Sequence, residues 1–216
     1  GERKEIHVIA FDYQDTGHFL KLLEGNRFDS RNYIDQIIQR LREAGLEASF
    51  TYDDLRAEMK QSFIGRIAVA RKMAGLGLVA DVDEAFDVYI GDFGQRKAHV
   101  APDISQYLPL DTAVREIRKA KGIPILCHPL SYHLTAAQTE RLVCDFKECG
   151  GLAMETEYAA YSRGQRDSLE ELASRFGLGR SAGSDFHARG SRCSLDQKFP
   201  IAFYDQLMSL KGMLGG

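Results

Sequence analysis

Residues 123–156 read IPILCHPLSYHLTAAQTERLVCDFKECGGLAMET, and this stretch decides the fold. Its two ends, IPILC and LAMET, are short apolar runs that predict buried β-strands. Between them, Thr135 and Gln138 form a T-x-x-Q capping box, which predicts the start of a helix that runs to Gly150. A strand, a helix and a second strand in this order are typical of parallel strands joined by a helical crossover.

Similar signals flank this stretch on both sides. Asp111 is predicted to cap a helix that precedes IPILC, and a last helix is expected near residues 203–213. The sequence predicts four strands, over residues 5–11, 123–127, 152–156 and 178–183. We therefore expect an α/β protein. Four strands suffice for an open sheet, whereas a closed parallel barrel needs about eight.

Residues 20–105 carry helical signals and no strand pattern, so we expect an all-helical insertion there. Ser30 is predicted to cap a helix whose apolar residues recur at i, i+3, i+4 and i+7, and Gly45 is predicted to end it. The further cap residues expected in this region are Thr51, Ser62 and Asp81.

The composition limits the possible functions. The 216 residues contain 28 Lys and Arg against 31 Asp and Glu, so no basic excess favours wrapping of nucleic acid. The four cysteines match no zinc or redox spacing and are expected to be reduced, as in a cytoplasmic protein. No apolar run approaches the ~18 residues of a membrane span, and the first residues show no signal-peptide pattern.

The strongest chemical signal is GSDFH, residues 183–187. Asp185 and His187 stand two apart directly after an apolar strand, and such residues point the same way in extended backbone. Parallel α/β folds place their active sites at the carboxyl ends of strands. A carboxylate and an imidazole there suit Zn, Mn or Fe. The alternative is a loop in which Asp185 caps a turn and His187 is solvated.

A second signal is CHP, residues 127–129, because His128 also follows an apolar strand. Two strand ends that each carry a ligand-type residue put a metal site on equal terms with packed or solvated side chains. His7 lies inside the first strand, on the face of Ile9 and Phe11, where a core or barrel-lining histidine is the simpler interpretation. It also lies early in its strand, away from the carboxyl ends.

Several residues are weaker candidates. His133 follows His128 by five residues in a loop, where a surface role is the simpler interpretation. Glu155 and Glu157 end the LAMETE run, and either offers a carboxylate to a site or to ordinary ion pairing. Basic side chains suit phosphate, and the candidates of this kind are Arg66, Lys97, Arg163 and Arg189.

The segments GIPILCHPLSYHL, RLVCDFKECGGLAMET and LEELASRFGLGRSAGSDFHARG resemble, in this order, the C-terminal half of a PHP domain, named after polymerases and histidinol phosphatase. EIHVIAFDY resembles an earlier strand of that family, and SFIGRIAVARKMAG through HVAP resembles its helical insertion. The resemblance covers about residues 4–190. It is greatest to the bacterial 3′,5′-nucleoside bisphosphate phosphatases and 5′→3′ exoribonucleases.

This resemblance implies a distorted (βα)7 barrel that binds two or three divalent metal ions, which are Mn, Zn or Fe. Residues 1–19 and 106–216 would form the barrel part, with residues 20–105 as the helical insertion. The residues that match the family's metal ligands are His7, His128, Asp185 and His187. Substrate contacts are expected from Arg66, Tyr132 and His133.

The sequence also departs from the family pattern. The family's first H-x-H pair, the Asp after it, and a further His and Glu are not in this sequence. We therefore expect a barrel that is incomplete at its N-terminal side and is completed by a missing segment or a second chain. Ser131 stands where relatives often have Arg, so one phosphate contact of the family is not expected, and His99 stands where they often have Tyr.

The resemblance implies a metal-dependent phosphoesterase. We expect hydrolysis of phosphomonoesters of 3′,5′-nucleoside bisphosphates, or hydrolysis at the 5′ ends of short oligonucleotides, by a metal-bridged hydroxide. The helical insertion would then help to choose the substrate, and no membrane partner is expected. The alternatives are a histidinol-phosphate-type phosphatase and an inactive fragment that needs the missing N-terminal strands.

Overall fold

The computed structural model describes residues 4–14, 17, 21, 29–59, 64–92, 94–103, 105, 107–186 and 198–212. The chain divides into two compact units. The first unit holds the β-sheet and comprises Gly1–Asn26, Ile104–Asp185 and Asp196–Gly216. The second unit comprises Arg27–Asp103 and Phe186–Leu195, and its described secondary structure is helical.

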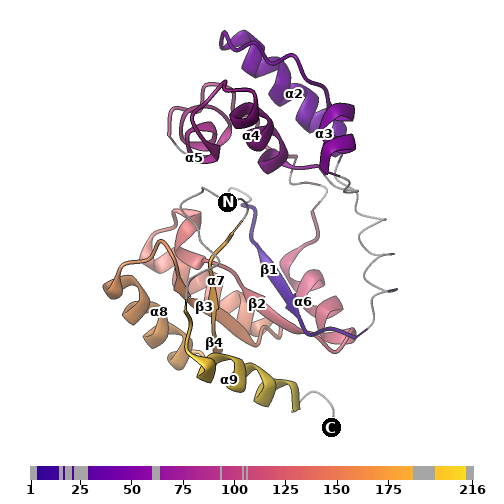
Figure 1. Ribbon diagram of the computed structural model, residues 1–216. Helices are drawn as coiled ribbons and strands as arrows, with labels where there is room; N and C mark the ends of the chain where they lie inside the picture. The colour runs from indigo at the N-terminus through magenta and orange to yellow at the C-terminus, as the bar shows by residue number, and fades with distance from the viewer. Residues whose placement is uncertain are drawn as a thin grey trace. The chain divides into compact units, whose positions relative to one another are not determined.

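Four strands form one sheet in the order β1-β2-β3-β4 (Figure 1). They are β1 (Val8–Phe11), β2 (Ile123–Leu126), β3 (Ala153–Tyr158) and β4 (Gly179–Gly183). All four lie where the apolar runs predict strands. β2, β3 and β4 are parallel to one another, as the helical crossovers between them predict.

β1 differs from the other strands, because it pairs with β2 in the antiparallel direction. Val8 lies opposite Leu126, and Phe11 lies opposite Ile123. The pattern that predicts parallel strands begins after residue 110 and does not extend to β1. The crossover rule applies to strands joined by one helical connection, whereas the whole helical unit lies between β1 and β2 in the chain.

Within the described residues, the helices α6 (Leu110–Lys119), α7 (Ala136–Glu148), α8 (Arg163–Arg175) and α9 (Ile201–Gly212) belong to the sheet unit. The capping box of Thr135 and Gln138 at the start of α7 is confirmed. Asp111 does not cap α6, because the helix begins one residue earlier, after Pro109. Proline fixes the backbone just before a helix, so Asp111 falls in the first turn, where a carboxylate favours the helix dipole.

Both faces of the sheet are covered, which explains why its strands read as apolar runs. One cluster of buried side chains joins Leu126 and Met154 to Val143 and Phe146 of α7. In a second cluster, Ile123, Ile125 and Ala153 pack with Leu207 of α9. No helix within the described parts of the chain is long and apolar enough to cross a membrane.

The second unit contains α2 (Ser30–Glu43), α3 (Tyr52–Met59), α4 (Arg66–Gly75), α5 (Val82–Glu84) and the π-helical turn η1 (Ala85–Ile90). Its buried core includes the predicted apolar stripe of α2, which is Ile34, Ile37, Ile38 and Leu41. No β-strand occurs among the residues described between 29 and 103, as expected.

The caps of this unit are partly as predicted. Asp81 accepts from Glu84 N, and Thr51 Oγ1 accepts from Asp54 N. Asp29, not Ser30, caps α2, because the Ser30 hydroxyl lies 2.9 Å from the Tyr52 hydroxyl and is used in that hydrogen bond. The predicted cap Ser62 lies outside the described residues.

The α7 cap provides a test of the fold. Replacing Thr135 by Ala removes the hydroxyl that accepts from Gln138 N, and we expect the free energy of unfolding to fall by about 1 kcal/mol. Urea denaturation followed by circular dichroism measures this change. Thr135→Ser keeps the oxygen and is expected to keep most of the stability. Equal losses in both variants would show that the cap is not the cause.

Candidate functional site

The antiparallel direction of β1 brings His7 and His128 together. His7 directly precedes β1, and His128 follows the last residue of β2 by two positions. Because the strands run in opposite directions, the start of β1 lies beside the end of β2, and Cys127 N donates to His7 O at 3.1 Å. A parallel β1 would have placed His7 a strand length away, ~13 Å for four residues. This arrangement explains how a residue early in its strand reaches the site.

The two imidazole rings are in contact. His7 Nδ1 lies 3.2 Å from His128 Nε2, and the ring planes are inclined at 79°. The His7 side chain is 53% exposed, whereas His128 is only 8% exposed as a residue. Two nitrogens that bind one ion tetrahedrally at ~2.1 Å lie ~3.4 Å apart. The pair therefore has the chemistry and the spacing of two ligands of one transition metal.

Glu155 adds a buried carboxylate beside this pair. It lies in β3, is 4% exposed, and its Oε2 accepts from His128 N at 2.7 Å. Burial raises the pKa of Glu155, and the Asp185 carboxylate raises it further, whereas the His128 N–H and His7 lower it. The sequence left Glu155 as one of two equivalent carboxylates, and only the side-chain geometry distinguishes it from Glu157.

Asp185 is linked to the same region through Tyr158. Tyr158 Oη donates to Asp185 Oδ2 at 3.0 Å, and its ring packs 5.6 Å from the ring of His128, centroid to centroid. Asp185 has a left-handed backbone with φ 51°. The structure thus brings three of the four predicted ligands, His7, His128 and Asp185, to one end of the sheet. His187 lies outside the described residues.

Tyr132 lies in the 3-10 turn η3 (Pro129–Tyr132), which follows β2. Its hydroxyl accepts from His7 N at 2.9 Å and donates to Cys127 O at 3.0 Å. Burial raises the pKa of Tyr132, so the phenol stays protonated at neutral pH. Tyr132 therefore joins the start of β1 to the end of β2. The exposed His133 follows it with φ 50°.

Three residues at these strand ends adopt left-handed backbone without being glycine. They are His128 (φ 25°), His133 (φ 50°) and Asp185 (φ 51°). Each such residue costs about 1–3 kcal/mol and persists only where its surroundings hold it in place. The same conformation also occurs at Asp12, Arg96 and Lys121, so it marks local strain at this end of the sheet and does not by itself select the site.

Arg66, the third expected substrate contact, belongs to the helical unit. Its Nη1 lies 2.8 Å from Asp92 Oδ1, and His99 Nε2 lies 3.1 Å from the same oxygen. Burial opposes the charge of Asp92, but the hydrogen bonds from Arg66 and His99 lower its pKa overall. Arg66 thus joins the start of α4 to the end of η1 and the residues that follow it. Of the other basic candidates, Arg163 is almost fully exposed and Arg189 lies outside the described residues.

No complete metal site is found in the part of the chain that the structure describes. There, no three His, Cys, Asp or Glu side chains come together as a metal site requires. The observed donor set is the histidine pair with two carboxylates nearby, which fits a cation in chemistry but does not enclose one.

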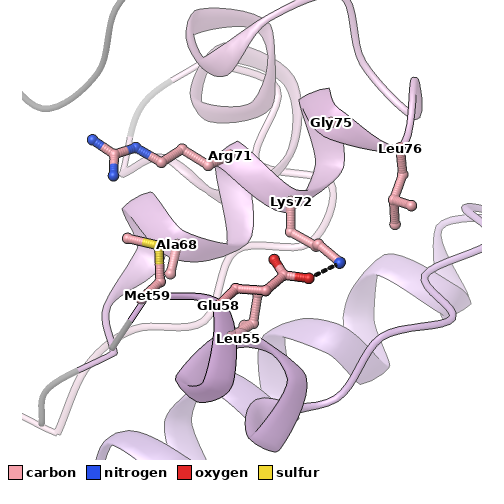
Figure 2. Close-up of a pocket in the computed structure, with 8 residues that line it drawn as sticks. All are labelled: Leu55, Glu58, Met59, Ala68, Arg71, Lys72, Gly75 and Leu76. Atoms are coloured by element: carbon pink, nitrogen blue, oxygen red, sulfur yellow. Dashed lines mark hydrogen bonds and ion pairs between the residues drawn. The ribbon is translucent and has the colours of Figure 1, made fainter. Parts of the chain in front are cut away.

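A pocket of about 190 Å³ lies in the helical unit (Figure 2). Leu55, Met59, Ala68 and Leu76 line it, and an ion pair between Glu58 and Lys72 crosses it. It is smaller than the ~300 Å³ of ordinary ligand pockets, and none of the predicted site residues lines it. The chemistry therefore points to the strand ends and not to this pocket.

The chain is similar in sequence to nucleotide-directed enzymes. It is 30% identical over 187 residues to a 5′-3′ exoribonuclease of Haemophilus influenzae, covering 86% of this chain and 65% of that protein. It is 32% identical over 189 residues to a 3′,5′-nucleoside bisphosphate phosphatase of Chromobacterium violaceum, covering 87% and 64%. A 5′-3′ exoribonuclease Rnm of Escherichia coli is 27% identical, with 86% and 61% covered. No protein-family model matches the chain.

Two solved structures share the fold. An amidohydrolase from Chromobacterium violaceum, with bound sulfate and no metal, matches with a TM-score of 0.67 at 24% identity, over 94% of this chain and 71% of that one. A candidate metal-dependent phosphoesterase from Bifidobacterium adolescentis matches with a TM-score of 0.70 at 20% identity and the same coverage. The chain is thus similar to bacterial enzymes named 5′-3′ exoribonuclease and 3′,5′-nucleoside bisphosphate phosphatase, the two kinds of enzyme that the sequence resembles most. It spans 61% to 65% of the length of the curated relatives named above.

The hydroxyl of Tyr132 provides a test of how the strand ends are joined. Tyr132→Phe removes its bonds to His7 N and Cys127 O, and we expect faster amide hydrogen exchange at His7 and a loss of about 1–2 kcal/mol in the free energy of unfolding. The matched control is Tyr161→Phe, which removes a hydroxyl bonded to Leu130 N. That control should leave His7 exchange unchanged. Unchanged exchange in Tyr132→Phe would contradict the proposed link.

Cys127 reports on the charge around the site. Burial, with smaller contributions from the negative charges of Glu155 and Asp185, raises its pKa to about 12. Since the thiolate is the reactive form, we expect alkylation in the folded protein to be very slow at pH 8 and to accelerate as the pH rises toward 12. Mass spectrometry of iodoacetamide-treated protein measures this rate. Labelling as fast as in urea would show that Cys127 is not protected.

Proposed function

We propose that the protein is a metal-dependent phosphoesterase that acts on nucleotides. The observation that carries this proposal is the meeting of His7 and His128 at 3.2 Å, beside Glu155 and at the same end of the sheet as Asp185. This is where α/β folds place their active sites. The relatives named as exoribonuclease and nucleoside bisphosphate phosphatase support the same chemistry.

The finer fold is part of the proposal. We propose a distorted (βα)7 barrel in which residues 20–105 form a helical insertion, with residues 1–19 and 106–216 in the barrel. The three parallel strands β2 to β4 and the two structural matches support it. Completion of the barrel by a further segment or a second chain is a prediction of the same proposal.

His7, His128, Asp185 and His187 would hold the metal ions, of which we expect two or three. Imidazole and carboxylate ligands suit Mn, Zn and Fe alike. Divalent ions supply a nucleophile from water at neutral pH and stabilise charge on phosphoryl oxygens. A cytoplasmic location also belongs to the proposal, and the expected reduced state of the cysteines supports it.

The protein side chains orient these ligands and the substrate. Tyr158 holds the Asp185 carboxylate by a hydrogen bond, and Tyr132 holds the His7 backbone. His133 follows His128 by five residues and is exposed, so its ring is accessible to a phosphate group. We propose that Tyr132, His133 and Arg66 contact the substrate, and that the helical insertion helps to select it.

The proposed substrates are 3′,5′-nucleoside bisphosphates and the 5′ ends of short oligonucleotides. With Mn²⁺, we expect phosphate release from 3′-phosphoadenosine 5′-phosphate or nucleotide release from a short 5′-phosphorylated RNA. Asp185→Ala should lower the rate at least about 100-fold. Loss of a side chain that only supports a metal ligand costs up to about 100-fold in activity, and loss of a ligand itself is expected to cost no less. The control Asp167→Ala removes an exposed carboxylate of α8 and should keep full activity.

Equal rates in the unsubstituted protein and Asp185→Ala would overturn this assignment. Failure of the unsubstituted protein to hydrolyse either nucleotide substrate with Mn²⁺ would also overturn it. Histidinol phosphate, assayed under the same conditions, separates the nucleotide assignment from the histidinol-phosphate alternative.

A further inference from the structure

Glu155 is a buried carboxylate that hydrogen-bonds to backbone. Its Oε2 accepts from His128 N at 2.7 Å, a short distance typical of a bond to a charged acceptor. The His128 that it contacts has φ 25° and ψ 60°, a backbone conformation that costs about 1–3 kcal/mol unless its surroundings hold it. The carboxylate therefore stabilises the strained residue at the point of strain.

A β-bulge in β3 separates Glu155, which faces His128, from Glu157. Glu155 pairs with Ser181, but Glu157 pairs with Ala182, so one residue of β3 is extra. Because Ser181 and Ala182 face opposite sides of the sheet, so do Glu155 and Glu157. Glu155 reaches His128, whereas Glu157 lies 3.1 Å from Arg166 of α8.

Gly183 makes room for the carboxylate. A methyl group at this position would overlap Glu155 Oε1 well inside van der Waals contact. Gly183 ends β4, two residues before Asp185. Any side chain at residue 183 would thus push the Glu155 carboxylate out of its place beneath His128.

We infer that Glu155 is a positioning residue, whose carboxylate, admitted by Gly183, holds the His128 backbone so that its Nε2 meets His7 Nδ1. The inference rests on the proposed function in taking His128 as a metal ligand. The alternative role for Glu155 is that of a further metal ligand. Glutamine at position 155 distinguishes the two roles. Its amide oxygen can accept from a backbone N–H as a carboxylate does, but it is a far weaker ligand for a divalent ion.

Metal affinity distinguishes these roles. We expect Glu155→Ala to weaken Mn²⁺ binding, measured by equilibrium dialysis and elemental analysis, about 10–100-fold. Glu155→Gln should stay within about threefold of the unsubstituted protein, because it keeps the acceptor. The control Glu157→Gln, on the other side of the same strand, should bind normally. Loss in Glu155→Gln as large as in Glu155→Ala would overturn the positioning role in favour of ligation.

Gly183 provides a second, independent test. Gly183→Ala should weaken Mn²⁺ binding to about the same extent as Glu155→Ala, because it displaces the same carboxylate. In Glu155→Ala/Gly183→Ala the two losses should not add, since the methyl group then occupies space that the carboxylate has left. Additive losses would show that Gly183 acts independently of Glu155 and would overturn this part of the inference.

A spectroscopic readout on metal-free protein separates this inference from the proposed function. The contact between His7 Nδ1 and His128 Nε2 requires one nitrogen to donate and the other to accept. Nitrogen-15 NMR of the histidine rings should show fixed tautomers in the unsubstituted protein and in Glu155→Gln, and averaged tautomers in Glu155→Ala. Fixed tautomers in Glu155→Ala would overturn the inference, whereas absence of Mn²⁺ binding with this pattern intact would overturn only the proposed function. Thermal unfolding confirms that each variant is folded.

Discussion

The hydrogen bonds between β1 and β2 are the constraint on which the site depends. They place the first residue of one strand beside the last residue of the other, and so bring together two histidines that are far apart in the sequence. A shift of one residue in this register would turn every side chain of β1 to the other face. The pairing therefore fixes both the distance between the imidazoles and the face on which they lie.

Hydrogen bonds to backbone groups hold this end of the sheet in place. Tyr132 and Glu155 bond to the main chain of His7 and His128 rather than to their rings. Held this way, His7 Nδ1 and His128 Nε2 remain turned toward each other. Buried polar groups of this kind are costly unless fully satisfied, so the site stores strain and buried charge that the two packed faces of the sheet must offset.

Much of the fold followed from the sequence, because the decisive signals were local. The apolar runs and the Thr135 capping box require only neighbouring residues, and these predictions were confirmed. Two cap predictions failed where an adjacent residue competes: Asp29 displaces Ser30, and Pro109 displaces Asp111. Such errors shift the start of a helix by one or two residues and leave its buried face unchanged.

The site was harder to predict for a different reason. The direction of β1 depends on its pairing with β2, and the whole helical unit separates these two strands in the sequence. No local sequence pattern therefore predicts this direction. His7 is therefore predicted as a metal ligand only by family resemblance. The antiparallel pairing of β1 with β2 explains why it lies early in its strand. The roles of Glu155 and Glu157 depend on the bulge, which alternation of residue types does not reveal.

The bulge in β3 means that this strand holds one residue more than its pairing with β4 requires. Deleting Thr156 would restore regular pairing with β4 while keeping both glutamates in the chain. Glu157 would stay opposite Ala182 and Tyr158 opposite Gly183, so the later side chains of β3 would keep their faces. Tyr158, which bonds to Asp185, would be among them. A single-codon deletion would thus remove the irregularity of the strand and leave the chemical groups of the site on the faces where they now lie.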